Sequence, residues 1–186
     1  NLHEAKFEQI EDNMVRVSGS KFVPTDEYFV KLEGVRKVGY RTISCAGVAD
    51  PIMISKIDDI TKSVKERVED NFASYGIKDF FLDFKIYGKN GVMGMFDDRG
   101  ATAGNELMII IEAVADSQEQ ADTICGFARS TMLHFGYEGR IATAGNLAFP
   151  FSPSDAKMGE VYEFNVYHLM KVDNPTTLFP IEYFQF

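Results

Sequence analysis

Hydrophobic residues recur along the chain with two different periods, and the two periods predict two kinds of element. From 51 to 75 they return every three or four residues, with charged residues between them, which predicts one amphipathic helix. Asp50 is a suitable N-cap for this helix, and Pro51 fits its first position. The same spacing from 118 to 135, preceded by Ser117 as a cap, predicts a second helix. Each helix therefore has one apolar side available for a core.

Alternation of apolar and polar residues, with a period of two, predicts strands. The segments with this pattern or with a short β-like run are, in chain order, 14–17, 28–32, 36–46, 79–87, 106–115 and 161–170. In 36–46 the alternation puts Val38, Tyr40 and Thr42 on one face and Arg41 on the other. Residues 1–12 are polar and weakly periodic, so we expect them to form a peripheral lead-in.

The order of these elements predicts a ferredoxin-like fold. From residue 36 onward it is strand, helix, strand, strand, helix, strand, which is the split βαβ (βαββαβ) pattern. Right-handed crossovers then place both helices on one face of a four-stranded antiparallel sheet. We expect an α+β chain in three parts: residues 1–35 as one or two extra N-terminal strands packed on the domain, residues 36–172 as its core, and residues 173–186 as an apolar tail.

The predicted sheet has a second face that no helix covers. This face stays apolar in either register, and it takes some of Tyr40, Tyr87, Tyr162 and Tyr167. An uncovered apolar sheet face is typical of a protein with a partner. We therefore expect a homo-oligomer or a complex with another domain or subunit.

Three loops meet at one end of the predicted fold. They are residues 45–51, 88–105 and 139–159, and they are rich in glycine, asparagine, serine and proline. The last two exceed the usual connection length of roughly 2–6 residues, and long loops in compact domains are commonly functional. The candidate ligand-binding residues in or beside these loops are Arg41, Lys89, Asn90, Arg99, Arg140, Asn146, Ser152 and Ser154.

Two interpretations of these polar residues stay open. The basic ones, together with the N-terminal end of the first helix, would suit a small anionic ligand such as a carboxylate or a phosphate. They would equally form ordinary salt bridges to Asp97, Asp98 or Asp155. The segment FPFSPSD, residues 149–155, either presents ligands from a rigid backbone or is a structural loop.

Catalytic chemistry has weak support in the sequence. Cys45 ends a strand near a helix N-terminus, where a thiolate is stabilised, but an inert buried cysteine fits the same position. Asp155 is the second candidate. The two cysteines lack CxxC spacing and the three histidines are scattered, so we expect no metal, no cofactor and no serine-type triad.

Composition narrows the class of protein further. Of the 186 residues 45% are hydrophobic, and the 16 Phe and 8 Tyr exclude intrinsic disorder. The net charge of −9 repels phosphate backbones, so nucleic acid is not an expected partner. No apolar run approaches the ~20 residues of a membrane span, and we find no secretion signal, so we expect a cytoplasmic protein without membrane contact. The start at Asn1 favours a piece of a longer protein or a disordered start.

Several stretches of the chain are distinctive: VRVSGSKFVP, KLEGVRKVGYRTISCAGVADPIMI, YGKNGVMG, and above all GRIATAGNLAFPFSPSD followed by VYEFNVYHLMKVDNPTTLFPIEY. They resemble the C-terminal region of acyclic terpene utilisation (AtuA-like) proteins, from Val15 to Tyr183. The resemblance implies a bacterial cytoplasmic protein linked to catabolism of branched acyl compounds, with a larger N-terminal domain ahead of this region. It assigns no catalytic role to any residue here.

The sequence therefore favours an accessory or assembly domain of an AtuA-like protein, which contributes its loops to a shared small-molecule site. Its partner would be a second copy or the N-terminal AtuA-like domain or subunit. One alternative is a self-sufficient enzyme that acts on a branched acyl or carboxylate substrate, free or CoA-linked. Another is a purely structural homo-oligomerisation module.

Overall fold

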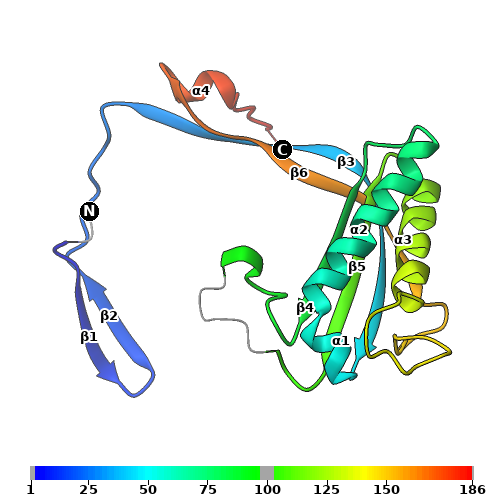
Figure 1. The fold of residues 1–186 in the computed structure, drawn as a ribbon. Helices are drawn as coiled ribbons and strands as arrows, with labels where there is room; N and C mark the ends of the chain where they lie inside the picture. Colours follow the sequence, from blue (N-terminus) through cyan, green and yellow to red (C-terminus); the bar gives the residue numbers. More distant parts are fainter. Residues whose placement is uncertain (1–2, 97–102, 186) are drawn as a thin grey trace. The chain divides into compact units, whose positions relative to one another are not determined.

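The computed structural model describes residues 3–96 and 103–185, and these form an α+β fold (Figure 1). The strands are β1 (Lys6–Glu11), β2 (Met14–Ser18), β3 (Tyr28–Val48), β4 (Phe81–Tyr87), β5 (Leu107–Ala115) and β6 (Asp155–Val172). The α-helices are α1 (Pro51–Ser55), α2 (Ile57–Ser74), α3 (Gln118–Leu133) and α4 (Pro175–Leu178), and Gly94–Phe96 is a 3-10 turn. The chain divides into two units. We name Val35–Glu163 the core unit, and Asn1–Gly34 with Phe164–Phe186 the terminal unit.

Four strands form one curled antiparallel sheet in the order β4-β5-β3-β6. In its register Cys45 of β3 lies opposite Ile110 of β5, and Phe84 of β4 lies opposite Ile111. The predicted α+β class and antiparallel sheet are thereby confirmed. A separate two-stranded sheet pairs β1 with β2 in the terminal unit.

Helices α2 and α3 lie side by side over one face of the four-stranded sheet (Figure 1). Alternate residues of β5 turn toward them, and Ile109 and Ile111 are fully buried. The predicted apolar stripes of the two helices supply the other half of this core, including Ile57, Val64, Val68, Ile124 and Met132. Burial of one such side chain contributes about 1.5–3 kcal/mol, so this layer holds the core unit together.

The first predicted helix is divided in two. Asp50 caps α1 as expected, because its carboxylate accepts the Ile52 N–H at 3.0 Å. At Lys56 the backbone leaves the helical region (φ −109°, ψ 11°) and its N–H bonds to Met53 O at 3.1 Å, so α2 starts one residue later. The second helix begins as predicted, with Ser117 as its cap.

Two strand predictions were wrong in their extent. Segments 28–32 and 36–46 belong to one strand, β3, because the backbone stays extended between them. The last strand begins at Asp155 instead of 161. It is an edge strand of the sheet, so its first residues are held by pairing with β3 and do not need an apolar pattern of their own.

The expected peripheral lead-in contains a strand that the sequence analysis missed. Residues 6–11 pair with β2, so that Phe7 lies opposite Val17 and Glu8 lies opposite Arg16. Pairing with a neighbour makes this segment a strand, although its own alternation is weak.

Gly39 reverses the expected faces of β3. Its φ of +149° is one that side-chain-bearing residues rarely adopt, and a Cβ there would lie 2.5 Å from the Ala115 carbonyl oxygen. Because of this irregularity Val38 and Arg41 line the same cavity on the helix-free face, whereas Thr42 is fully buried on the helix side. The prediction that Val38 shares a face with Thr42 was therefore wrong.

Within its described positions, 3–34 and 164–185, the terminal unit contains no buried residue. Its side-chain contacts are exposed ones. Lys171 pairs with Glu27 at 2.5 Å, and the Lys31 ammonium lies 4.7 Å from the centre of the Tyr167 ring. The terminal unit is thus built from pairing strands without a core of its own.

Candidate functional site

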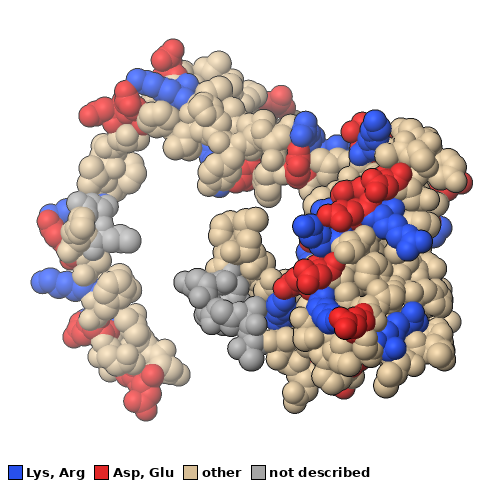
Figure 2. Space-filling model, viewed as in Figure 1, with Lys and Arg blue, Asp and Glu red and all other residues tan. Residues whose placement is uncertain are grey.

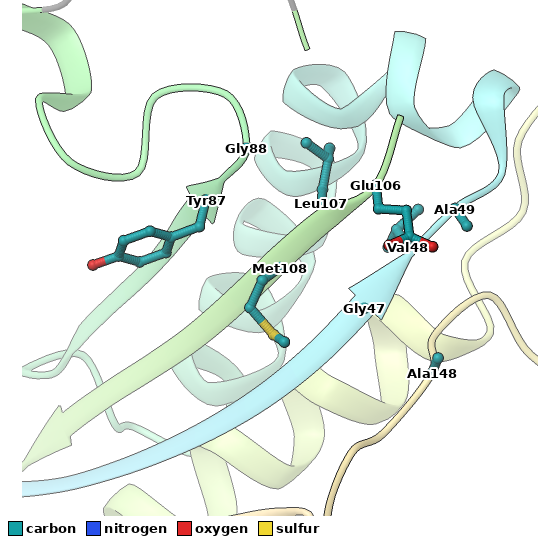
Figure 3. A pocket seen from close by; sticks show the side chains of 9 residues that line it. All are labelled: Gly47, Val48, Ala49, Tyr87, Gly88, Glu106, Leu107, Met108 and Ala148. Carbon is teal, nitrogen blue, oxygen red and sulfur yellow. The ribbon is translucent and has the colours of Figure 1, made fainter. Parts of the chain in front are cut away.

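Segments of all three expected loops meet in one cavity at the end of the sheet. This end cavity has a volume of about 420 Å³, and its lining residues are Gly47, Val48, Ala49, Tyr87, Gly88, Glu106, Leu107, Met108 and Ala148 (Figure 3). The backbones of Gly47 and Ala148 exchange two hydrogen bonds, of 2.7 and 2.9 Å, and so join the third loop to the end of β3. The structure therefore brings residues of these three loops together.

The wall of the end cavity is largely apolar side chain and backbone. Figure 3 shows Tyr87 and Met108 projecting from neighbouring strands, and their positions lie opposite each other in the register of β4 and β5. Gly88 follows β4 with a φ of +91°. This position requires glycine, because a Cβ there would lie 2.8 Å from the Glu106 carbonyl oxygen. Glu106 is the one charged residue in the lining. The lining thus suits an apolar group, and among residues 3–96 and 103–185 it contains no cation for an anion.

The predicted basic residues have carboxylate or carbonyl partners outside this cavity. The Lys89 ammonium pairs with the Asp58 carboxylate in the first turn of α2. Arg140 donates to the His134 carbonyl at 3.3 Å, at the C-terminal end of α3. Arg99 lies outside the described residues. Binding of a small anion by these side chains stays a prediction, and it would have to compete with these contacts.

Asn146 closes the end of α3. Its side-chain amide donates to Phe135 O at 2.8 Å and to Met132 O at 3.3 Å, and its backbone N–H donates to Leu133 O at 2.9 Å. Met132 and Leu133 belong to the last turn of α3 and Phe135 follows it, where carbonyls lack the full set of helical partners; the Met132 carbonyl also accepts the Phe135 N–H at 3.2 Å. The amide at this position thus has a structural task.

The remaining candidates from the hairpin and from FPFSPSD also make local contacts. Asn90 folds back on the edge of β4, where its N–H donates to Ile86 O at 3.2 Å. The Ser154 carbonyl accepts a hydrogen bond of 3.1 Å from Ser44, while Ser152 is exposed. The structure does not bring these residues to the end cavity.

Arg129 of α3 holds segment 149–155 in place. Its Nε lies 2.7 Å from an Asp155 carboxylate oxygen, and its guanidinium lies 5.7 Å from the centre of the Phe149 ring. Asp155 is thus the partner of a cation on the helix side of the sheet. Cys45 lies in the β3 register opposite Ile110, on the helix-free face. The two candidate catalytic residues are therefore on opposite faces of the sheet.

A charged cluster on the helix-free face was missed by the sequence analysis. Glu112 of the central strand is only 7% exposed, and it pairs with Lys85 of β4 and with Arg41, whose Nε lies 2.5 Å from Oε1. Lys85 also lies 3.4 Å from Asp83. The signal was present in the apolar run LMIIIEAVA, where Glu112 is the single charge. A buried carboxylate in a central strand requires such counter-charges.

A second cavity, of about 520 Å³, adjoins this cluster. We name it the open-face cavity, and its lining includes Val38, Arg41, Phe81, Glu112 and Val114. The helix-free side of the sheet therefore combines apolar side chains with paired charges. Figure 2 shows the side of the core unit on which helix α2 lies, and basic and acidic side chains are mixed there too.

On the helix side, a buried polar network joins α3 to β3. Thr42 donates to the Asp122 carboxylate at 2.6 Å, and Gln118 donates to Thr42 at 2.7 Å. Burial alone would raise the pKa of Asp122, but the hydrogen bonds from Thr42, Lys157 and Gln118 outweigh it and lower the pKa. The polar groups of Thr42, Gln118 and Asp122 are thus hydrogen-bonded to one another, which leaves them a structural role between α3 and β3.

Asp50 and Tyr137 form a partly buried contact near the start of α1. The Tyr137 hydroxyl donates to the Asp50 carboxylate at 2.5 Å. This bond and the N–H of Ile52 lower the pKa of Asp50, while burial and the bond to Asp50 raise the pKa of Tyr137 to about 12. Both shifts belong to a helix cap that is tied to the segment after α3.

Comparison with family models, with curated proteins and with solved structures finds no match to this chain. Among residues 3–96 and 103–185, no three His, Cys, Asp or Glu side chains are grouped so that they could hold a metal ion. No helix in the described part of the chain is long and apolar enough to span a membrane.

Proposed function

We propose that the chain is an accessory or assembly domain, which docks through its terminal unit and contributes the end cavity to a site shared with its partner. One observation carries this proposal. The terminal unit has no buried residue in its described positions, yet it holds more than half of the exposed large hydrophobic side chains of the described chain. Phe22 and Tyr167, for example, are 92% and 75% exposed.

Exposed apolar surface of this extent favours a docking role on physical grounds. A two-stranded hairpin is marginally stable by itself in water and needs a further strand or a packing surface. Each large apolar side chain that a partner covers would contribute about 1.5–3 kcal/mol. The terminal unit thus supplies a strong driving force for association.

The end cavity fits the second half of the proposal. Its apolar wall, with Glu106 as the one charge, would accept the hydrocarbon part of a ligand. A cation for a carboxylate or CoA phosphate would then come from the partner. A branched acyl compound has this chemistry, and such a ligand agrees with the resemblance to AtuA-like proteins. The same resemblance is the basis for proposing a bacterial origin and a cytoplasmic location.

We also propose that the core unit has the ferredoxin-like topology. The support is the element order from β3 to β6, in which helices follow the first and the third of these strands, together with the strand order β4-β5-β3-β6. This is the order that a split βαβ unit gives.

A pair of matched variants tests the docking role. Tyr167 of the terminal unit is 75% exposed and Tyr75 of the core unit 76%, so Tyr167→Ser and Tyr75→Ser remove the same side chain at equal exposure. We expect Tyr167→Ser to weaken assembly of the purified chain, measured by sedimentation velocity, or to reduce its binding of an apolar dye where the chain is monomeric. Tyr75→Ser should change neither. A monomer that binds no dye in wild-type form would contradict the proposal.

A further inference from the structure

The β1–β2 hairpin has one apolar face and one charged face. The register puts Phe7 opposite Val17 and Gln9 opposite Val15 on one side. On the other side Glu8 pairs with Arg16 at 3.4 Å. Phe7, Val15 and Val17 are all more than half exposed. We name this side the hairpin apolar face. Nothing in the described part of the chain buries it.

The core unit has an uncovered surface of matching chemistry. On the helix-free face of the sheet, Phe81, Tyr87 and Met108 are exposed hydrophobic residues, and they flank the half-buried Ile110. We name this set the open sheet face. The charges in its middle, those of Glu112 and its two cations, form ion pairs with one another, while the Arg41 Nε makes no hydrogen bond within the described part of the chain. A cover for this surface therefore needs apolar side chains and little charge.

The accessible surface of the chain exceeds that of compact bodies of its mass by at least the area that an obligate dimer buries per chain. The accessible surface of the chain is 13581 Å². Two compact bodies with the masses of the core and terminal units, roughly 14.5 and 6.4 kDa, would together expose about 10,700 Å², which leaves an excess of about 2,900 Å². A standard interface covers only about 800 Å² per partner, whereas obligate homodimers cover roughly 1,000–2,500 Å² per chain. The excess thus exceeds what a small contact would cover.

We propose that the partner is a second copy of this chain, and that each copy lays its hairpin apolar face on the open sheet face of the other. The inference rests on the proposed assembly function and names its partner. One chain carries both surfaces, so two exchanged contacts form a closed pair with twofold symmetry and leave neither surface free. A different protein would have to supply two complementary surfaces, whereas a second copy supplies both.

Methionine oxidation combined with sedimentation tests this exchange on the full chain. Met108 lies on the open sheet face and is 40% exposed. Met95 lies in the 3-10 turn between β4 and β5 and is 90% exposed, and Met132 is fully buried. We expect the wild-type chain to be a dimer in which peroxide oxidises Met95 rapidly and spares both Met108 and Met132. Met95 and Met132 serve as internal references for the oxidation rates of an exposed and of a buried methionine.

Two neighbouring substitutions on β2 give the matched comparison. Val17→Asp places a charge on the hairpin apolar face, and Ser18→Asp places the same charge one residue later on the opposite face. Val17→Asp should weaken the dimer by about a hundredfold or more, because each dimer contains two such contacts, and should make Met108 reactive. Ser18→Asp should leave the dimer and Met108 as in wild type. If Val17→Asp weakens the dimer but Met108 stays unreactive, the proposed exchange of hairpins is refuted.

Other outcomes separate the two proposals. A wild-type monomer with reactive Met108 overturns the second copy as partner and leaves the assembly role to a different chain. A wild-type monomer whose Met108 is protected until Val17 is changed overturns both proposals, because the hairpin then covers its own chain. A dimer that Val17→Asp does not weaken overturns the exchange alone. Met108→Asp checks the receiving surface in case Val17→Asp unfolds the hairpin, and it should weaken the dimer to a similar extent.

Discussion

Replacing Glu112 by alanine should lower the free energy of unfolding by about 2 kcal/mol. Glu112 lies in the central strand β5, is 7% exposed, and holds both Arg41 and Lys85. Removing one partner of a fully buried pair costs roughly 3–5 kcal/mol. The cations left behind keep 38% and 37% of their side chains exposed, so water can solvate them and the expected cost is smaller.

Urea unfolding followed by far-UV circular dichroism measures this loss. For a chain of this size about 2 kcal/mol corresponds to roughly 4–8 °C in Tm. The loss is measured at protein concentrations low enough for the chain to be monomeric, because the cluster also lies in the middle of the open sheet face. Lys62→Ala, which removes an exposed pair to Glu66 at 4.0 Å, is the control and should change stability by less than about 0.5 kcal/mol. If Glu112→Ala unfolds like the control, the cluster does not stabilise the sheet and the reasoning is refuted.

Three further substitutions test the local structure. Gly39→Ala should cost about 2 kcal/mol in thermal unfolding, because φ is +149° and the new Cβ would lie 2.5 Å from a backbone oxygen, whereas Gly76→Ala, at φ +78° with open space around it, should cost about 1 kcal/mol. Asn146→Ala should cost about 1–2 kcal/mol and speed amide exchange in the last turn of α3, whose carbonyls lose their donor. Tyr137→Phe removes the bond that lowers the pKa of Asp50. A carboxyl group whose pKa is lowered by folding stabilises the fold at pH values above its pKa in the unfolded chain, and this stabilisation is lost as the pH falls through the lowered pKa. In urea unfolding, wild type and Tyr137→Phe should therefore differ in stability at neutral pH and converge below about pH 4.

The helices and the central strands could be predicted because their signals are local. Asp50 and Ser117 are caps that act within three residues of themselves, and the apolar stripe of each helix is the side that packs on β5. Strand β1 could not be predicted in this way, because its pairing with β2 stabilises it more than its own pattern does. The faces of β3 were misjudged since the unusual φ of Gly39 depends on contact with β5.

The meeting of the three loops was expected from the predicted order of elements, but the contacts of the individual polar residues were not. Lys89 pairs with a carboxylate on α2, and Asn146 donates to carbonyls at and just after the end of α3. Both partners are distant in sequence from the loop tips where a ligand was expected. The Glu112 cluster joins three strands, so no single segment displays it. Only the isolated charge in an apolar strand hinted at its presence.

The mass of the purified chain in solution tests the central claim most directly. Sedimentation velocity over a hundredfold range of concentration reports whether the terminal unit recruits a partner copy. The account predicts a species of twice the chain mass of 20.9 kDa, which dissociates when Val17 becomes Asp and persists when Ser18 becomes Asp. A single species of 20.9 kDa at every concentration, with no binding of an apolar dye, would contradict it.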